Sequence, residues 1–456
     1  NYPNFDLNDT RNTDTLMGMP LLDEKGNKTG EYLTEENMDV LDDEEMLYQH
    51  LDALWKNYCI SSTYEPGSVA KPFTVAAGVE SGKITGTETY NCEGSLEIGG
   101  WPIRCHNRYG DGLLTVQEGI ERSCNVVMMK IGQAMGTDTF VKFQHIFNFG
   151  LKTNIDLQGE ARTASLIYTK DTMGSTEMAT NTFGQSFNVT MIQMITGFCS
   201  LINGGYYYEP HMVSKIVSPS GATVQNIEPR VLKQTISEDT SDMIREYCNT
   251  VVTGEHGTGK TAGYAIGGKT GTAGTIPRKN GEYVVSFMGY APADDPQIAI
   301  YVVVDRPNVQ YQDDAKFATR IVRGILTEVL PYMGIFMTEE LSDSEREELE
   351  ALQIEIRAAP AAEEGGDTTE EGTGEENGED TGTEGEEETE KEEVWKSFPI
   401  DPATGYAVDP NTGDMVDPVT GAVIGGSYDE NAEEPDVSPS PEASADPEGD
   451  TGDTGQ

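Results

Sequence analysis

The sequence predicts an α+β fold, in which an antiparallel sheet with flanking helices is followed by a separate acidic tail. Helical patterns recur between residues 34 and 251, and strand patterns with short Gly, Asn and Pro connections and one last helix come after them. Charge is concentrated after residue 338, where 38 Asp and Glu accompany only 4 Lys and Arg. We therefore expect one globular body, residues 1–338, and one solvated tail, residues 339–456.

The expected elements of the body follow from residue spacing. An acidic first turn favours a helix over residues 34–57, and an apolar stretch favours another over residues 68–81, with Gly82 as its C-cap. The remaining segments are two helical stretches within 115–135 broken near Ser123, helices at 190–201 and 237–251, strands at 264–266, 283–290 and 297–305, and a helix at 316–330.

The tail is of low complexity. Glu, Gly and Thr dominate residues 361–393, and three eight-residue repeats begin at Asp401, Asp409 and Asp417. Short repeats rich in Asp, Pro and Gly cannot bury a core, so we expect an extended spacer or display segment rather than a domain, and we expect the tail to be dispensable for catalysis.

Composition also limits the partners. The body carries 41 acidic and 26 basic residues, which argues against nucleic acid as a partner. No apolar run reaches about 18 residues and no signal peptide opens the chain. Because the first residue is Asn rather than Met, we expect a fragment that lacks its targeting segment.

Six cysteines show no C-x-x-C pairing, which argues against a zinc site, and we expect no metal and no cofactor. Buried thiols are the simplest interpretation. A Cys105–Cys124 disulfide is an alternative hypothesis for an oxidising compartment.

The stretch "GEHGTGKT" at residues 254–261 matches a phosphate-binding loop, and the apolar run "IYVVVD" ends in Asp305. Such a loop requires a strand before the glycines and a helix after the lysine. Here the preceding segment has helical spacing, and the following one holds five glycines in thirteen residues. An NTPase is therefore disfavoured.

A different set of motifs indicates acyl transfer. Ser68 is followed three residues later by Lys71, so the two share a helix face. A lysine among apolar neighbours can lose its charge and act as the base for a serine nucleophile. Ser68-x-x-Lys71 alone is a weak signal, because the pattern arises by chance about once in a chain of this size.

Two further motifs strengthen this interpretation. In "SCN", the Ser123 hydroxyl could relay a proton and Asn125 could bind a substrate amide, although both could simply cap helices. A second S-x-N begins at Ser186, where we expect a helix to start. In "KTGT", Lys269, Thr270, Gly271 and Thr272 suit a carboxylate-bearing extended substrate, and the backbone N–H groups of Ser68 and Thr272 could stabilise an oxyanion.

With these motifs the chain resembles the penicillin-binding proteins, which are serine D,D-transpeptidases that cross-link peptidoglycan. The resemblance covers about residues 1–335, and the "YEPGS" wording is similar to the class B branch. "GTGK" often precedes the KTG strand in that family, which accounts for the apparent phosphate loop. The matching segments are "YEPGSVAKPF", "SCN", "GQSFNVT", "NGG" and "GGKTGTAG".

The resemblance implies the penicillin-binding, serine β-lactamase-like fold and a role for each motif. Ser68 is implied as nucleophile, Lys71 as base and Ser123 as proton relay; Asn125 and the Lys269–Thr272 motif are implied to bind substrate. It further implies peptidoglycan stem peptides as substrates, β-lactams as inhibitors and a division or sporulation complex as partner. The catalytic domain is implied to lie outside the cytoplasm, anchored by an N-terminal helix absent from this fragment. "GQS" departs from the family's usual "GQG" and is expected to tighten the loop at Ser186.

Two alternatives keep the same serine and lysine. A β-lactamase also needs a group that activates water, and Glu160 lies in "GEARTA" without the E-x-x-L-N pattern of class A enzymes, so a glutamate in a turn is the simpler interpretation. A β-lactam-binding sensor or an inactive cell-wall scaffold differs from the enzyme only in turnover.

Overall fold

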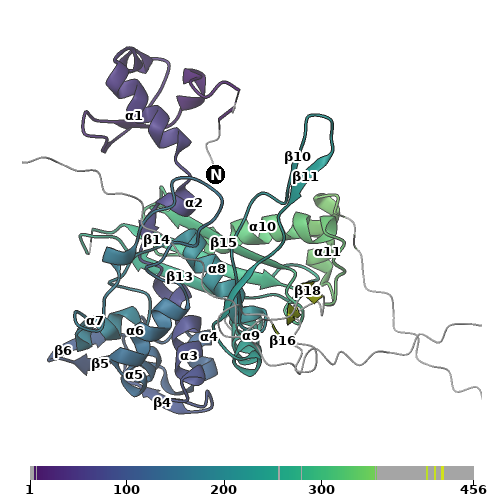
Figure 1. Cartoon of the computed structure of the whole chain (residues 1–456). Helices are drawn as coiled ribbons and strands as arrows, with labels where there is room; N and C mark the ends of the chain where they lie inside the picture. Colours follow the sequence, from purple (N-terminus) through teal and green to yellow (C-terminus); the bar gives the residue numbers. More distant parts are fainter. Residues whose placement is uncertain are drawn as a thin grey trace, which may run out of the picture. The chain divides into compact units, whose positions relative to one another are not determined.

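The computed structural model describes residues 5–354 except 7, 255, 256 and 279, together with residue 356 and three short strands in the tail (Figure 1). The α-helices are α1 Glu44–Trp55, α2 Tyr58–Ser61, α3 Lys71–Glu80, α4 Val116–Glu121, α5 Asn125–Met135, α6 Thr137–Ile146, α7 Ser175–Asn181, α8 Met191–Ile202, α9 Glu238–Thr253, α10 Lys316–Tyr332 and α11 Asp343–Ala351. The strands are β1 Pro20–Leu22, β2 Lys28–Tyr32, β3 Thr63–Tyr64, β4 Thr89–Cys92, β5 Ser95–Ile98, β6 Trp101–Arg104, β7 Gly112–Thr115, β8 Val189–Thr190, β9 Tyr206–Tyr208, β10 Lys215–Val217, β11 Thr223–Asn226, β12 Val231–Gln234, β13 Gly267–Gly274, β14 Tyr283–Ala291, β15 Ile298–Asp305, β16 Ala407–Val408, β17 Met415–Val416 and β18 Val423–Gly425.

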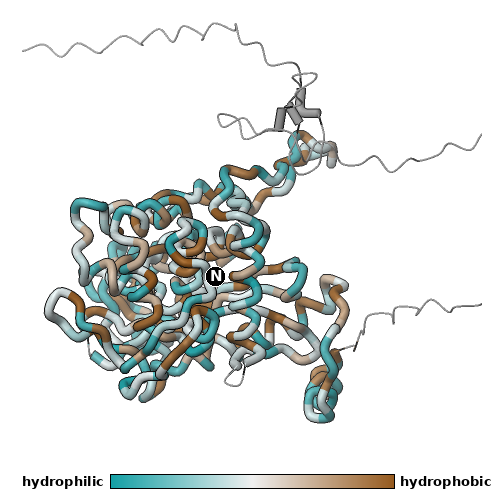
Figure 2. The backbone as a smooth tube through the Cα atoms, turned by 90° about the horizontal axis from the view of Figure 1, so that it is seen from below, coloured by the Kyte–Doolittle hydropathy of each residue, from teal (hydrophilic) through white to brown (hydrophobic). Residues whose placement is uncertain are grey.

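The main sheet is antiparallel, in the order β13-β14-β15, and both of its faces are covered. Alternate residues of a strand point to opposite faces. In β14, Met288 and Tyr290 join the core formed with α3, α5 and α8, whereas Phe287 joins a second core with Val322 of α10. Figure 2 shows hydrophobic stretches, in brown, alternating with hydrophilic ones, in teal, along the backbone of this body. The predicted α+β class with an antiparallel sheet and flanking helices is confirmed.

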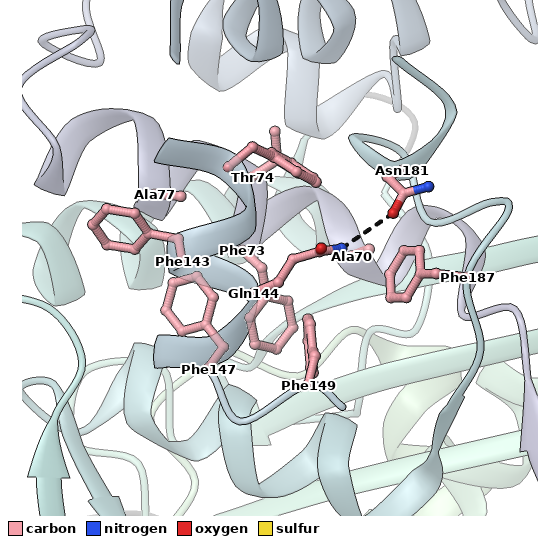
Figure 3. Close-up of a pocket in the computed structure, with 11 residues that line it drawn as sticks. Ala70, Phe73, Thr74, Ala77, Phe143, Gln144, Phe147, Phe149, Asn181 and Phe187 are labelled. Carbon is pink, nitrogen blue, oxygen red and sulfur yellow. Dashed lines mark hydrogen bonds between the residues drawn. The ribbon is translucent and has the colours of Figure 1, made fainter. Parts of the chain in front are cut away.

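Helix α3 lies at the centre of the helical part, and its residues from Lys71 to Gly78 are all buried. The Phe73 ring packs against Phe147 and Phe149, with ring centroids 5.3 and 5.1 Å away. These rings line a pocket that also contains the Gln144–Asn181 hydrogen bond (Figure 3). The pocket has a volume of only about 20 Å³, which is too small for a peptide, and the packed aromatic side chains that line it support α3.

Three expectations at element ends were wrong. The first long helix begins at Glu44, where Asp43 caps it, because residues 38–42 form a 3-10 helix. The turn Gly67–Ala70 is 3-10 and α3 begins only at Lys71. Ser186 starts no helix; it lies in a loop with φ +67°, and α8 begins after Thr190, which caps it.

The described residues on either side of segment 254–261 form neither the strand before it nor the helix after it that a phosphate-binding loop requires. The helix α9 precedes it, and Thr261 forms an isolated bridge with Tyr264 rather than starting a helix. None of the helices in the described part of the chain is both long and apolar enough to cross a bilayer.

The packed body continues past the predicted boundary at residue 338. Leu349 of α11 is buried in the core that contains Val322 and Leu326 of α10, and Arg323 pairs with Glu348. Because these residues are mostly acidic, the sequence predicted them to belong to the solvated tail. A surface helix needs apolar residues on one face only, so a short acidic helix can still pack against the core. The chain divides into two compact units, Asn1–Thr369 and Glu370–Gln456.

The tail repeats contain strands, which the expected extended spacer did not include. β16 and β17 occupy the last two positions of the first two repeats, and β18 begins at the seventh position of the third and ends at Gly425. The three strands pair as an antiparallel sheet, with Val408 opposite Met415 and Val416 opposite Val423. The low-complexity segment at residues 361–393 lies outside the described residues.

We expect that ending the chain after residue 356 leaves the acylation by β-lactams that the resemblance implies, measured with benzylpenicillin, within about twofold of the full chain. Ending it after Leu341 should instead lower the free energy of unfolding by about 1.5–3 kcal/mol, because the burial of Leu349 is lost. Chemical denaturation and adduct formation measured on both truncated chains check this. A loss of acylation in the longer chain would contradict a dispensable tail.

Candidate active site

Ser68 lies in the 3-10 turn Gly67–Ala70, immediately before α3, and is half-buried. This turn contacts β13 closely: a Cβ on Gly67, at φ +63°, would lie 2.7 Å from the Thr272 carbonyl oxygen. Only glycine permits that approach. The predicted nucleophile and the predicted oxyanion-binding strand are therefore adjacent, although they are about two hundred residues apart in sequence.

Lys71 is completely buried and contacts Ser123. Its Nζ donates hydrogen bonds to the Ser123 carbonyl oxygen at 2.5 Å and to Ser123 Oγ at 2.9 Å. Among the described residues, no hydrogen bond joins Lys71 Nζ to the hydroxyl of Ser68. Burial, with a smaller contribution from the nearby charge of Lys269, lowers the pKa of Lys71 to about 7. Lys71 can therefore exist as a neutral amine at physiological pH.

Ser123 joins α4 to α5 with φ +54°, an unusual conformation for a non-glycine residue. Cys124 caps α5 through its sulfur, and Asn125 is the first residue of that helix. The Asn125 side chain donates to the Arg104 carbonyl at 3.3 Å. The loop therefore holds the Ser123 hydroxyl against Lys71 and leaves Asn125 half-buried.

The KTGT motif lies on β13, as the resemblance to the family implied, whereas the strand expected at residues 264–266 does not form and β13 begins only at Gly267. Lys269 is buried and its Nζ donates to the carbonyl and hydroxyl oxygens of Thr270 at 3.3 and 3.4 Å. Burial lowers its pKa to about 8. A Cβ on Gly271 would lie 2.4 Å from Ser286 Oγ and 3.1 Å from the Pro66 carbonyl oxygen, so a larger residue here would displace its neighbours. Thr272 remains half-buried beside the Ser68 turn.

Glu65, which the sequence analysis did not single out, joins three loops beside Ser68. Its carboxylate is 8% exposed and accepts two bonds of 2.6 Å from Arg278 Nη2 and one of 3.0 Å from the Ser186 N–H. A charged residue inside the apolar stretch "YEPGSVA" was the signal that could have found it. Because Ser186 also contacts Thr180 through its hydroxyl at 3.0 Å, the positive-φ serine is held in place.

The hydrogen bonds that the Glu160 carboxylate accepts come from residues of its own loop. It is buried and accepts bonds from the Thr153 N–H and hydroxyl and from the Asn154 N–H. This agrees with the simpler interpretation of Glu160 as a structural glutamate rather than a water-activating group.

The six cysteines are free thiols, and three of them lie together although no C-x-x-C pair exists. Cys105 and Cys124 have their sulfur atoms 3.8 Å apart, so the hypothesised disulfide pair is adjacent but unbonded. The proximity of Cys105 and Cys124 was anticipated, but nothing in the sequence spacing indicated that Cys92 joins them.

Residues 25–327 match the family described as penicillin binding protein transpeptidase domain. Because that match covers well over half of the chain, the chain belongs to this family. The class B assignment made from the motifs is confirmed.

Comparisons with individual proteins agree with this family assignment. The chain is 39% identical over 290 residues to stage V sporulation protein D of Bacillus subtilis, covering 61% of this chain and 44% of that protein. It is 27% identical to the probable peptidoglycan D,D-transpeptidase PenA of Neisseria flavescens over 63% of this chain and 70% of that protein. Crystalline penicillin binding protein 3 of Mycobacterium tuberculosis, complexed with ampicillin, is 24% identical with a TM-score of 0.57, covering 62% of this chain and 65% of that one. That last likeness shows the fold.

Proposed function

We propose that this chain is a serine D,D-transpeptidase that cross-links peptidoglycan stem peptides through an acyl-enzyme and is inhibited by β-lactams. The observation that carries the proposal is the buried Lys71, the first residue of the helix that follows Ser68, whose Nζ donates a hydrogen bond to Ser123 Oγ. The name of the Neisseria flavescens relative and the ampicillin complex of the Mycobacterium tuberculosis neighbour support the same activity.

In this mechanism the neutral Lys71 amine takes the proton of the Ser68 hydroxyl, and Ser68 Oγ attacks the carbonyl carbon of the donor peptide. The backbone N–H groups of Ser68 and Thr272 stabilise the oxyanion of the tetrahedral intermediate. Ser123, hydrogen-bonded to Lys71, passes the proton to the leaving amine. The amine of a second stem peptide then attacks the ester and frees Ser68.

The remaining residues bind the substrate. Asn125 bonds an amide of the peptide backbone, and Lys269 with Thr270 and Thr272 binds the terminal carboxylate. Gly271 allows the peptide to lie close to β13, as an extended segment beside a strand does. Two lysines of lowered pKa in one site are typical of a site built for proton transfer and anion binding.

Intact mass after incubation with benzylpenicillin tests this proposal. The expected result is one stable adduct per chain, absent from Ser68→Ala, whose fold is checked by circular dichroism. An adduct equally present in Ser68→Ala would refute the assignment. A stable adduct without turnover of stem-peptide substrates would instead favour a β-lactam-binding sensor or scaffold, and rapid consumption of penicillin would favour a β-lactamase.

We further propose that the domain works outside the cytoplasm, tethered by an N-terminal membrane helix to a division or sporulation complex. Similarity to stage V sporulation protein D supports the sporulation setting, and this chain spans less than half of that relative. Protease accessibility of the domain in intact spheroplasts tests its location, and complete protection would contradict it.

A further inference from the structure

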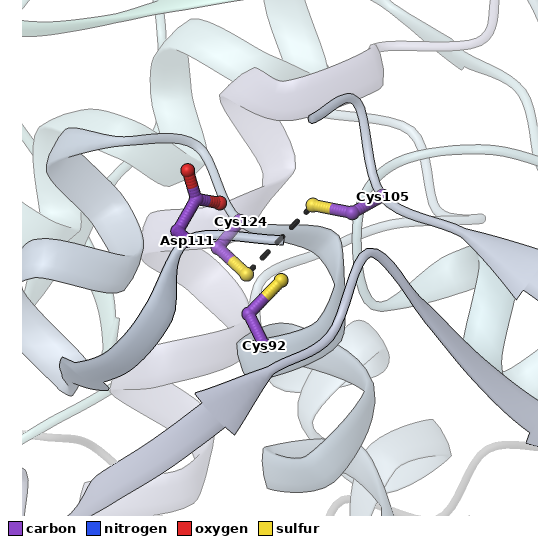
Figure 4. A group of neighbouring side chains, drawn as sticks. All are labelled: Cys92, Cys105, Asp111 and Cys124. Carbon is purple, nitrogen blue, oxygen red and sulfur yellow. Dashed lines mark hydrogen bonds between the residues drawn. The ribbon is translucent and has the colours of Figure 1, made fainter. Parts of the chain in front are cut away.

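Four side chains that the proposed mechanism does not use form a cluster beside the Ser123 loop (Figure 4). Cys92, Cys105 and Cys124 are 1% exposed or less, and Asp111 is half-buried. One sulfur or oxygen atom of each lies within 4.8 Å of the corresponding atoms of the other three. Figure 4 shows the three sulfur atoms directed toward one another.

The four residues come from separate elements that the fold brings together. Cys92 ends β4, opposite Gly112 of β7, and Asp111 immediately precedes β7. Cys105 follows β6, where its N–H donates to the Gly94 carbonyl at 2.8 Å. Cys124 caps the first turn of α5. The cluster thus lies where a strand pair, a hairpin end and a helix start meet.

The spacing of the donor atoms suits a tetrahedral metal ion. Two sulfurs at about 2.3 Å from a zinc ion, at the tetrahedral angle, are about 3.8 Å from each other. The Cys105 and Cys124 sulfurs are 3.8 Å apart. A cation of this size therefore needs little movement of either thiol.

The polar atoms around the cluster are arranged as they are around a bound cation. Asp111 Oδ1 accepts a bond of 2.8 Å from Asn107 Nδ2, whereas Oδ2 is buried and has no hydrogen-bond partner in the described structure. An unpaired buried carboxylate oxygen is costly unless a cation satisfies it. The Asn125 and Val127 N–H groups point at Cys105 and Cys124 sulfurs, at 3.3 and 3.5 Å. Such outer hydrogen bonds orient metal ligands.

We propose that Cys92, Cys105, Cys124 and Asp111 bind one thiophilic divalent cation, with zinc as the best match. Three sulfur donors disfavour magnesium and calcium, which prefer oxygen. Binding releases the three thiol protons to solvent, and the resulting three thiolates and one carboxylate complete a four-coordinate site. No change of oxidation state is involved.

The proposed metal site lies next to the loop that carries Ser123, so a bound cation would fix the conformation of that loop. Cys124 lies between Ser123 and Asn125, and Ser123 keeps an unusual positive φ. A metal ion would tie this loop to β4 and β7 and hold the Ser123 hydroxyl in place against Lys71. The site competes with a Cys105–Cys124 disulfide, because each sulfur can serve only one of them. Cys92 and Asp111 take part in metal binding but not in the disulfide, so changing them tests the metal site alone.

Cobalt titration of the full chain, kept reduced with a phosphine and free of chelator, tests the proposal. We expect one equivalent of Co²⁺ with a thiolate charge-transfer band and the intense visible bands of a tetrahedral site, displaced by one equivalent of Zn²⁺. Cys92→Ser and Asp111→Asn should each weaken binding at least about tenfold. Cys199→Ser, which changes a cysteine outside the cluster, should bind like the unchanged chain.

The readout separates this site from weak binding by the acidic tail, since cobalt held by carboxylates gives no thiolate band. Less than about 0.1 equivalent with that band on the reduced, folded chain would overturn the proposal. So would equal affinity in the unchanged chain, Cys92→Ser and Asp111→Asn. Because Asp111→Asn keeps the shape of the side chain, and circular dichroism reports folding, a loss of structure is recognised. Benzylpenicillin adduct formation is measured separately, so failure of the metal site leaves the proposed function standing.

Discussion

Replacing Lys71 with Ala is expected to slow acylation of Ser68 by benzylpenicillin by about 10²–10⁴-fold, the usual contribution of a positioned general base. The physical reason is the burial of Lys71, which lets its amine be neutral near pH 7 while it contacts Ser123. Lys71→Arg should be as slow as Lys71→Ala, because a guanidinium keeps its proton in proteins. The measurement is the second-order acylation rate constant from rapid-quench mass spectrometry.

Lys83→Ala is the matched control, since Lys83 lies just beyond the end of α3 and is exposed. It should acylate at the unchanged rate. Retention of more than about a tenth of the rate in Lys71→Ala would show that another group takes the serine proton.

The pH profile of the same rate constant gives an independent check. Protonated Lys71 cannot accept a proton, so the rate should rise as pH increases through about 7. Loss of the Lys269 charge weakens binding of the penicillin carboxylate, so the rate should fall as pH passes about 8. The resulting bell-shaped curve has limbs that belong to the interacting pair of lysines rather than to either one alone. A rate that stays constant between pH 5 and 9 would contradict both roles.

The second large effect is expected at Glu65 and Arg278. Arg278→Ala leaves the Glu65 carboxylate buried with the Ser186 N–H as its remaining partner among the bonds described. Breaking a fully buried ion pair costs about 3–5 kcal/mol, and because the Arg278 side chain is 40% exposed we expect about 2–3 kcal/mol here. Since the pair holds the Ser68 turn and the β13–β14 connection together, acylation should also slow by up to about 100-fold.

The Arg306–Asp305 pair offers a matched comparison, because both of its side chains are nearly half-exposed. Arg306→Ala should change the free energy of unfolding by less than about 1 kcal/mol and leave acylation unchanged. Urea unfolding of both variants measures the difference. Equal costs for the two arginines would mean that the buried pair has no special role.

Much of the candidate site could be predicted because its motifs are local. Ser68 and Lys71 are three residues apart, Ser123 and Asn125 two apart, and a contiguous segment supplies the Lys269–Thr272 motif. Helix and strand periodicity also placed α8, α9, β14 and β15 to within a few residues. By contrast, the start of α1 and the loop at Ser186 were missed, because local propensity does not reveal a 3-10 turn or a positive φ held by tertiary contacts.

Periodicity, short spacings and composition were enough to predict the fold class, the acyl-transfer motifs and the acidic tail. Which distant groups meet became known only from the folded structure. It placed Lys71 against Ser123, Arg278 against Glu65, Leu349 in the core of α10, and Asp111 among three cysteines. Such contacts join residues that are tens to hundreds of positions apart. The spacing of residues along the chain does not show which of them will lie next to each other after folding.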